Sequence, residues 1–383
     1  MNKESIRELV EWFEEATAWA RVAVKEASEA GTPIIGLYCG YIPSEIIRAS
    51  GALAVGLCGS TPAAVADGEV ALPRNFCPLI KSSYGLAITD TCPYFHFADA
   101  LIGETTCDGK KKAFELFAEM KPIHVMQLPY DADTDRAYVQ WRAEIDRVVG
   151  FIEGITGTTI THESLSREIR DANEVRSLLA DVASTFEAEH PAMSWEDMLV
   201  VQNAGGFLTD RSKYKEKLRE LAGALRATPP VAKRGNGRPR VLLTGTPIAP
   251  TTNKVMRLID EAGGQVVCHD ACSGVKMYDR LVDESGDPLE SLTRYTLGLP
   301  CACMSPNPGR IDLLAKSIER YRIQGVVENV WQACHTFNVE SVVVGRVCEN
   351  DLKIPHLKLE TDYAESDLDQ LRVRIEAFVE MLE

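Results

Sequence analysis

A chain of 383 residues is too long for one ordinary hydrophobic core, so two or three domains are expected. Its 41 basic and 56 acidic residues leave a net charge of −15, which argues against a broad surface for nucleic acid or anionic membrane. No apolar run is long enough to span a bilayer. Residues 1–11 form an acidic amphipathic helical pattern without the apolar core of a signal peptide, so we expect a cytoplasmic protein.

The N-terminal part of the chain alternates short apolar runs with helical patterns. Such alternation is typical of βαβ units around a parallel sheet. In chain order, the sequence predicts strands at 33–38, 52–57, 98–103 and 123–128. The helices predicted between them cover 43–50, 78–87 and 108–120. Residues 1–132 are therefore expected to form an α/β lobe.

The pattern from residue 133 to residue 227 is almost wholly helical, and this segment is expected to bridge two lobes. Residues 228–240 are rich in proline, glycine and basic side chains, which is typical of a linker. A second α/β lobe is expected over 241–383. Its predicted elements are a strand and turn at 241–247, a helix at 253–262, strands at 265–268, 325–330 and 354–359, and a C-terminal helix from about residue 366. The predicted fold class is α/β, with two doubly wound parallel-sheet lobes, a helical bridging segment and the functional site in the cleft between the lobes.

Eleven cysteines are not expected to form a disulfide framework in a cytosolic chain, where thiols stay reduced, so their positions must identify any ligands. Ligands of open α/β sheets bind beyond the carboxyl ends of the strands. The cysteines predicted at that edge are Cys39, Cys58, Cys77, Cys107, Cys272, Cys301, Cys303 and Cys334. Cys92 and Cys348 map to the opposite edge and Cys268 to a strand, so these three are expected to be structural.

The chemistry predicted for the edge thiols is iron–sulfur binding. Cys77 and Cys107 each stand at a predicted helix start, where free N–H groups and the helix dipole favour the thiolate form. Structural zinc sites usually pair their ligands at short spacing, and most of these thiols are widely separated. A polynuclear cluster held by several loops therefore fits the spacing better, with zinc as the alternative.

Several long motifs resemble the 2-hydroxyacyl-CoA dehydratase/benzoyl-CoA reductase family, specifically its dehydratase D-component type. They include Leu72-Pro-Arg-Asn-Phe-Cys-Pro-Leu-Ile-Lys-Ser-Ser-Tyr84, Gln332-Ala-Cys-His335 and Glu360-Thr-Asp-Tyr363, with further matches at 38–47, 89–95, 103–112 and 124–129. The resemblance implies one [4Fe–4S] cluster on three cysteines, which by motif are Cys77, Cys107 and Cys334. It also implies an ATP-hydrolysing activator protein that delivers a low-potential electron, which the dehydratases use to form a ketyl radical from a 2-hydroxyacyl thioester.

The surplus of edge thiols is similar to the homodimeric branch called double-cubane cluster proteins, in which two cubanes share a bridging sulfide. Six thiolates would then be needed. The predicted set is Cys39, Cys77, Cys107, Cys272, Cys303 and Cys334, with Cys58 and Cys301 in reserve. Many relatives have Gly-Cys-Pro where this chain has Gly245-Thr-Pro247, so no thiol is obligatory at that turn.

Three functions follow from this resemblance. The leading one is ATP-dependent, low-potential reduction of a small unsaturated molecule, with His335, Glu104, Lys81 and Tyr363 as candidates for proton delivery or substrate contact. The second is a [4Fe–4S] subunit of a 2-hydroxyacyl-CoA dehydratase, and the third is a non-enzymatic cluster carrier or redox sensor. The chain has no G-x-x-x-x-G-K-[ST] loop, so nucleotide hydrolysis is expected on the partner protein.

Overall fold

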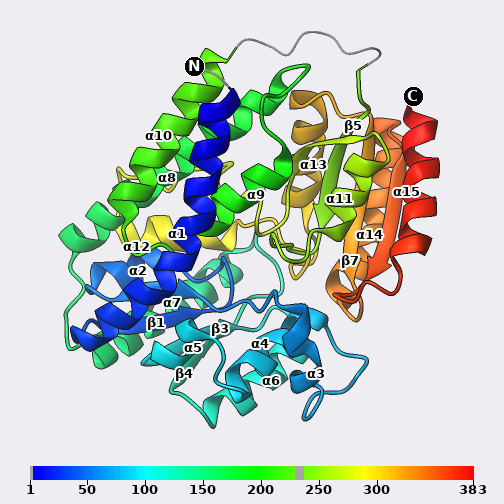
Figure 1. Cartoon of the computed structure of the whole chain (residues 1–383). Coiled ribbons are helices and arrows are strands. Elements are labelled where there is room, and N and C mark those ends of the chain that lie inside the picture. The colour runs from blue at the N-terminus through cyan, green and yellow to red at the C-terminus, as the bar shows by residue number, and fades with distance from the viewer. Residues whose placement is uncertain (1–2, 229–236) are drawn as a thin grey trace.

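The computed structural model describes residues 3–228 and 237–383, and within them lie two sheets of four parallel strands each. The first sheet, in the order β2-β1-β3-β4, contains β1 (Ile34–Leu37), β2 (Leu53–Gly56), β3 (Ala100–Glu104) and β4 (Ile123–Met126). The second sheet, in the order β6-β5-β7-β8, contains β5 (Arg240–Gly245), β6 (Gln265–His269), β7 (Gly325–Trp331) and β8 (His356–Thr361). Both sheets follow the same order, so the prediction of two parallel-sheet lobes on one plan is confirmed (Figure 1).

Helices cover both faces of the first sheet. Its own helices are α2 (Ser44–Ala49), η1 (Pro62–Ala64), α3 (Val65–Gly68), α4 (Pro78–Ile88), α5 (Pro93–Phe97) and α6 (Asp108–Ala118). Ile34 and Leu101 pack with apolar side chains of α4, α5 and α6. Ile35 and Ile102 point to the other face and pack with α2 and α7 (Asp135–Thr156). This alternation follows from the two-residue period of a strand and explains why the strands are apolar throughout.

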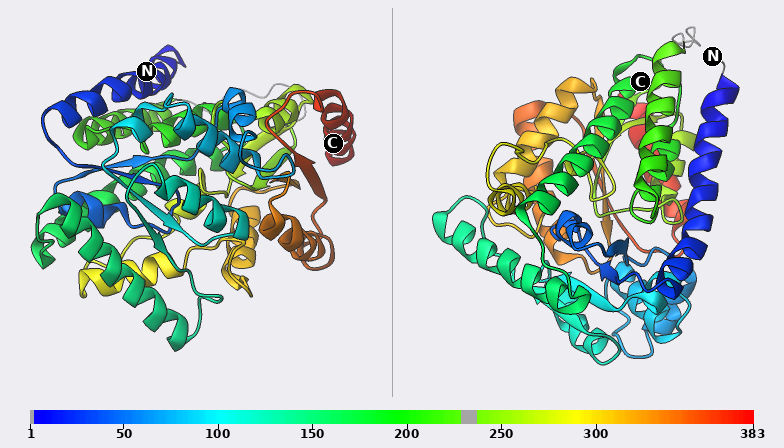
Figure 2. Two further views of the ribbon diagram at one scale, coloured as in Figure 1. Left: turned by 90° about the horizontal axis from the view of Figure 1, so that it is seen from below. Right: turned by 90° about the vertical axis from the view of Figure 1, so that its left-hand side faces the viewer.

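Long helices join the two lobes (Figures 1 and 2). The predicted helical segment contains α7, α8 (His162–Ser184), η2 (Thr185–Glu187), α9 (Trp195–Ala204) and α10 (Arg211–Ala227). The N-terminal helix α1 (Lys3–Glu29) packs on α9 and α10, and its Phe13 shares one apolar core with the second sheet. Most of the predicted linker, residues 229–236, lies outside the described residues. Its last residue, Arg240, begins β5 and donates to the Phe186 carbonyl at 2.6 Å.

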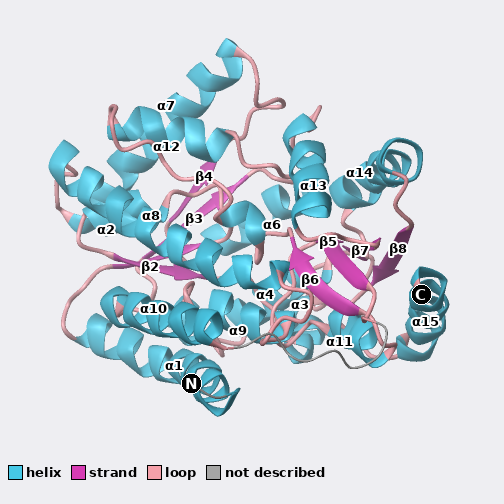
Figure 3. Cartoon of the chain, turned by 90° about the horizontal axis from the view of Figure 1, so that it is seen from above, coloured by secondary structure: helices cyan, strands magenta, loops and turns pink. Residues whose placement is uncertain are grey.

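The second sheet is also covered on both faces (Figure 3). On one side lie α11 (Lys254–Glu261) and α15 (Leu368–Leu382), which contact each other. On the other side lie α13 (Pro308–Arg320) and α14 (His335–Arg346). The shorter turns of this half are η3 (Val275–Met277) and the π-helical η4 (Val347–Leu352).

One helix of the second half packs on the first lobe. Helix α12 (Pro288–Leu297) lies against α7, where Trp141 Nε1 donates to Thr296 Oγ1 at 2.8 Å. The following loop is fixed in the same way, because Tyr41 Oη donates to the Leu299 carbonyl at 3.0 Å. These contacts carry the segment that contains Cys301 across to the first lobe.

The predicted element boundaries differ from the observed ones by one or two residues. Helices α3, α5, α12 and α14 were not predicted. Among the described residues, no helix combines the length and apolar character needed to cross a membrane.

Candidate functional site

The carboxyl ends of five strands are followed within a few residues by a cysteine. Cys39 follows β1, Cys58 follows β2, Cys107 follows β3, Cys272 follows β6 and Cys334 follows β7. All eleven cysteines of the chain are described and all are free thiols. The strands of a parallel sheet point the same way, so this placement brings chemically active side chains to one edge of each sheet.

Three thiols, Cys77, Cys107 and Cys334, form what we call the first thiol group. Each is the N-cap residue of a helix, namely α4, α6 and α14. Burial and then the nearby Cys77 raise the pKa of Cys334 to about 12, and Cys107 acts in the same direction. The backbone N–H groups of the helix starts act in the opposite direction, as where Lys110 N donates to Cys107 Sγ at 3.4 Å. Both lobes therefore contribute to one group of thiols whose anionic form is supported by helix N-termini.

Four more thiols, Cys39, Cys272, Cys301 and Cys303, form the second thiol group. Burial and then Glu104 raise the pKa of Cys39, which also lies near Cys272 and Cys301. Cys301 and Cys303 are hydrogen-bonded to each other, and this contact is the main reason that the pKa of Cys301 is lowered. Burial opposes the shift, whereas the Lys276 ammonium favours it.

A buried ion pair lies between the two groups. Lys110 Nζ donates to Glu104 Oε1 and, at 3.0 Å, to the Tyr38 carbonyl. Burial lowers the pKa of Lys110, but Glu104 and then Cys39 outweigh it, so the pKa lies above its usual range. The same ammonium stabilises the thiolates of Cys77 and Cys107. Lys110 is thus a cation shared by both thiol groups.

Glu104 is fully buried at the end of β3, and its Oε2 atom has no hydrogen-bond partner. Burial raises the pKa of its carboxyl against the effect of Lys110. The Cys39 thiol also donates to this carboxylate. An unpartnered buried oxygen is costly unless another group meets it, so Glu104 fits a role toward a bound group.

The thiols are too widely spaced to share one ion. In the described part of the chain, no three His, Cys, Asp or Glu side chains come close enough to hold a single metal ion. Single zinc ions need such a set, whereas the iron atoms of a cubane occupy separate corners and take one thiolate each. The donor chemistry therefore fits a polynuclear iron–sulfur cluster better than a single zinc ion.

The profile of the family described as 2-hydroxyglutaryl-CoA dehydratase, D-component, matches residues 39–382. The chain belongs to this family. It is 40% identical to the "Putative dehydratase subunit YjiM" of Escherichia coli (strain K12), with 97% of each chain covered. It is 21% identical to the (R)-phenyllactyl-CoA dehydratase beta subunit of Clostridium sporogenes, with 94% of each covered. It is also 21% identical to one of the subunits of benzoyl-CoA reductase from Thauera aromatica, over 88% of this chain and 87% of that one. The predicted family and its dehydratase-type enzyme class are confirmed.

The four residues predicted to deliver protons or contact substrate lie in different surroundings within this family member. Glu104 lies between the thiol groups, as described above. Lys81 is buried on α4, and its ammonium pairs with Glu69 at 2.8 Å and donates to the Arg74 carbonyl at 2.9 Å. Both partners lie in the segment before α4, so Lys81 fixes that segment to the helix. These contacts favour a structural role for Lys81.

Tyr363 and His335 flank the first thiol group. Tyr363 is buried, and its hydroxyl donates to the Gly59 carbonyl at 3.1 Å, which ties the second lobe to the loop after β2. Burial and then the nearby Cys77 raise the pKa of Tyr363. His335 is the first residue of α14 and is exposed. It therefore lies next to the thiol of Cys334 along the chain but on the outer surface.

Cys58 and the three cysteines predicted to be structural complete the set. Cys58 Sγ donates to the Tyr38 carbonyl at 3.0 Å, and desolvation by the surrounding protein raises its pKa to about 11. Its other neighbours include Lys110 and Cys272. Because Cys58 is exposed, it lies at the edge of the two thiol groups. Away from them, Cys268 and Cys348 are buried and Cys92 is the N-cap of α5.

The sequence interpretation missed two cations of the second thiol group. Lys276 is buried on η3 and donates to Cys272, and it also faces Cys301. Arg310 is buried at the start of α13, 3.0 Å from Glu328 and 2.9 Å from Glu340, and its charge also reaches Cys301. A sequence carries little signal for this, because a lysine or arginine that is buried by long-range packing looks the same as an exposed one.

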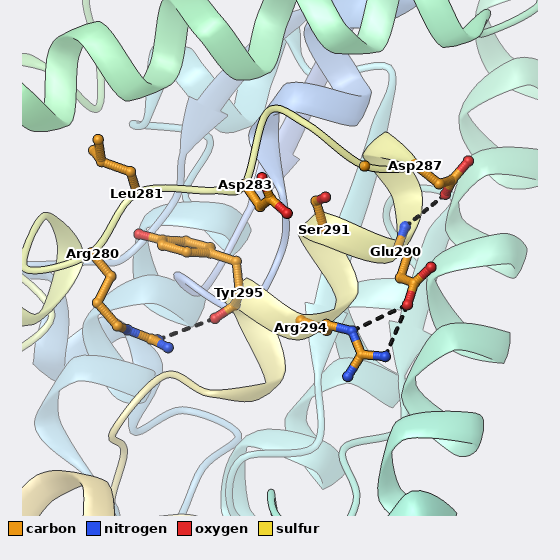
Figure 4. A pocket seen from close by; sticks show the side chains of 9 residues that line it. Arg280, Leu281, Asp283, Asp287, Glu290, Ser291, Arg294 and Tyr295 are labelled. Atoms are coloured by element: carbon orange, nitrogen blue, oxygen red, sulfur yellow. Dashed lines mark hydrogen bonds and ion pairs between the residues drawn. The ribbon is translucent and has the colours of Figure 1, made fainter.

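A hollow of about 360 Å³ lies beside α12 (Figure 4). Its charged side chains are satisfied by their neighbours: Arg294 pairs with Glu290 at 2.8 Å, and Asp287 caps the Glu290 N–H at 2.8 Å. Arg280 donates to the Gly298 carbonyl at 2.7 Å. No cysteine lines this hollow, so it is separate from the thiol groups.

Proposed function

We propose that this chain is an iron–sulfur enzyme that performs ATP-dependent, low-potential reduction of a small unsaturated substrate. In this proposal the chain holds an [8Fe–9S] double-cubane cluster, and a separate ATP-hydrolysing iron–sulfur activator supplies the electrons. The observation that carries the proposal is the presence of two thiol groups, one on each side of the Lys110–Glu104 pair. We also propose that the chain forms a homodimer and that it binds neither nucleic acid nor a membrane.

Three ligands would come from each group. Cys77, Cys107 and Cys334 would hold one cubane, while Cys39 and Cys272 would hold the other with one member of the Cys301–Cys303 pair. Such a cluster supplies electrons of very low potential, tuned by the charge and burial around it. Lys110, Lys276 and Arg310 would offset the negative charge of the thiolates. The unpartnered Oε2 of Glu104 is the best placed atom to hold a proton near the cluster.

The sixth ligand is expected to be Cys301, which the sequence interpretation held in reserve behind Cys303. Cys301 faces both Lys276 and Arg310, whereas the Cys303 thiol donates to Tyr41 Oη at 3.6 Å. We predict that Cys301→Ser loses iron and that Cys303→Ser retains most of it, as measured by iron and acid-labile sulfide after anaerobic purification. The reverse result would restore Cys303 as the ligand.

A second candidate function is the [4Fe–4S] subunit of a radical 2-hydroxyacyl-CoA dehydratase. The first thiol group alone supplies the three ligands that this function needs, and two of the relatives are named dehydratase subunits. In this case the second thiol group would be a set of buried thiols without a cluster. A different partner subunit of the same family would be required for activity.

The iron content of the anaerobically purified chain separates the two functions. The double cubane predicts about eight irons per chain and the single cubane about four. Activity of the chain alone with its activator would support the reductase, whereas dependence on a second, different subunit would support the dehydratase. A protein that binds no iron under these conditions would contradict both.

A further inference from the structure

The outer face of helix α14 carries an apolar stripe that nothing in the fold covers. Its exposed residues are His335, Val339, Val342, Val343 and Arg346, which share one side of the helix. The three valines are 71%, 51% and 47% exposed. No carboxylate is exposed on this helix, although the chain carries a net charge of −15. We call these three valines the valine stripe.

The valine stripe is unfavourable for the isolated fold. A β-branched side chain lowers helix propensity, and an apolar side chain that stays exposed contributes no free energy of burial. Scattered exposed apolar residues are normal, but three adjacent ones on a helix face indicate a contact surface. Local rules of this kind are broken most often at functional sites.

The stripe begins beside the first thiol group. Cys334 is the N-cap of α14, and Val339 lies five residues further along, which is about 7–8 Å of helix. Asn307 Nδ2 donates to Glu340 Oε1 at 2.7 Å and so joins α14 to the loop that precedes α13. In the same loop, Ser305 N donates to the carbonyl of Tyr130 at 2.9 Å, and the Tyr130 side chain is 75% exposed. Figure 3 shows α14 at the outer side of the second lobe, with no helix beyond it.

The size of this surface fits a short-lived protein partner. Stable interfaces take about 20–30 residues from each side, whereas redox partners that meet transiently use much smaller contacts. Three valines are too few to hold two copies together permanently, so the proposed homodimer would form through another surface. We propose that the valine stripe is the docking surface for the iron–sulfur activator, which would place the donor next to Cys334. This inference rests on the proposed function and adds the location of the contact.

The test compares two exposed valines of similar accessibility on opposite sides of the second sheet. Val339→Asp alters the stripe, and Val373→Asp on α15, where the valine is 66% exposed, is the matched control. Each protein is reduced in two ways: by titration with the purified activator and ATP, and by titanium(III) citrate, a small donor that needs no docking surface. We expect Val339→Asp to raise the half-saturating activator concentration at least tenfold. Val373→Asp should match the wild type, and titanium(III) should reduce all three proteins equally.

Each other outcome has a definite meaning. Equal activator dependence in all three proteins would overturn the docking inference while leaving the proposed function intact. Failure of the wild type itself to accept electrons from the activator would instead contradict the proposed function. A change in sedimentation of Val339→Asp, with unchanged activator dependence, would assign the stripe to contact with a second copy and so overturn the inference as well.

Discussion

Replacement of Cys107 by alanine is expected to remove at least half of the iron that the chain binds. Cys107 is the N-cap of α6, lies near Cys77 and Cys334, and belongs to the ligand set of both candidate functions. The thiolate is the ligand form, and alanine cannot replace it. Iron and acid-labile sulfide per chain after anaerobic purification measure the loss directly.

Cys92 provides the matched control for this experiment. It is also a free, half-buried thiol that caps a helix, in this case α5, but it lies outside both thiol groups. Cys92→Ala should therefore retain the iron content of the wild type, and so should Cys348→Ala. Equal iron in the Cys107 and Cys92 variants would mean that Cys107 is not a ligand. Its position at a helix start would then have been mistaken for a ligand site.

The arrangement of strands could be predicted from the sequence because it depends on local patterns. Short apolar runs between helical patterns predict parallel strands, and the cysteines after them then fall at the carboxyl ends. This reasoning correctly placed Cys39, Cys107 and Cys334 after their strands, as the observed β1, β3 and β7 confirm. Which of these thiols bind a cluster stays a prediction.

The parts that could not be predicted depend on contacts between distant segments. Helix α12 was missed, and its position against α7 rests on pairs such as Trp141 and Thr296, which are 155 residues apart. Lys110 stands in the run Lys110-Lys111-Lys112, which is typical of a solvated helix start. The structure exposes Lys111 and Lys112 but turns the Lys110 ammonium inwards to Glu104. Lys110 differs from Lys111 and Lys112 because the packing of α6 beside β3 brings it to Glu104.

Replacement of Lys110 by methionine is expected to lower the free energy of unfolding of the cluster-free protein by about 3–5 kcal/mol. Methionine keeps much of the side-chain volume but leaves the carboxylate of Glu104 buried without its cation. Glu104→Gln should also destabilise the protein, because it leaves the Lys110 ammonium unpaired. The double variant Lys110→Met/Glu104→Gln should recover most of the loss, since a buried pair replaced as a whole leaves no isolated charge. Urea unfolding at neutral pH measures all four proteins.

The pH dependence of the Lys110→Met variant gives an independent check on this interpretation. Burial already raises the pKa of Glu104 in the wild type, and loss of Lys110 removes the main effect that opposes burial. A carboxyl whose pKa is higher in the folded than in the unfolded state binds its proton more tightly when folded, so the folded state loses stability as pH rises through this range. The deficit of Lys110→Met relative to the wild type should therefore shrink at acidic pH and grow as the pH rises to neutral and alkaline values. A deficit that is independent of pH, or a double variant no more stable than Lys110→Met, would mean that Lys110 acts through packing alone.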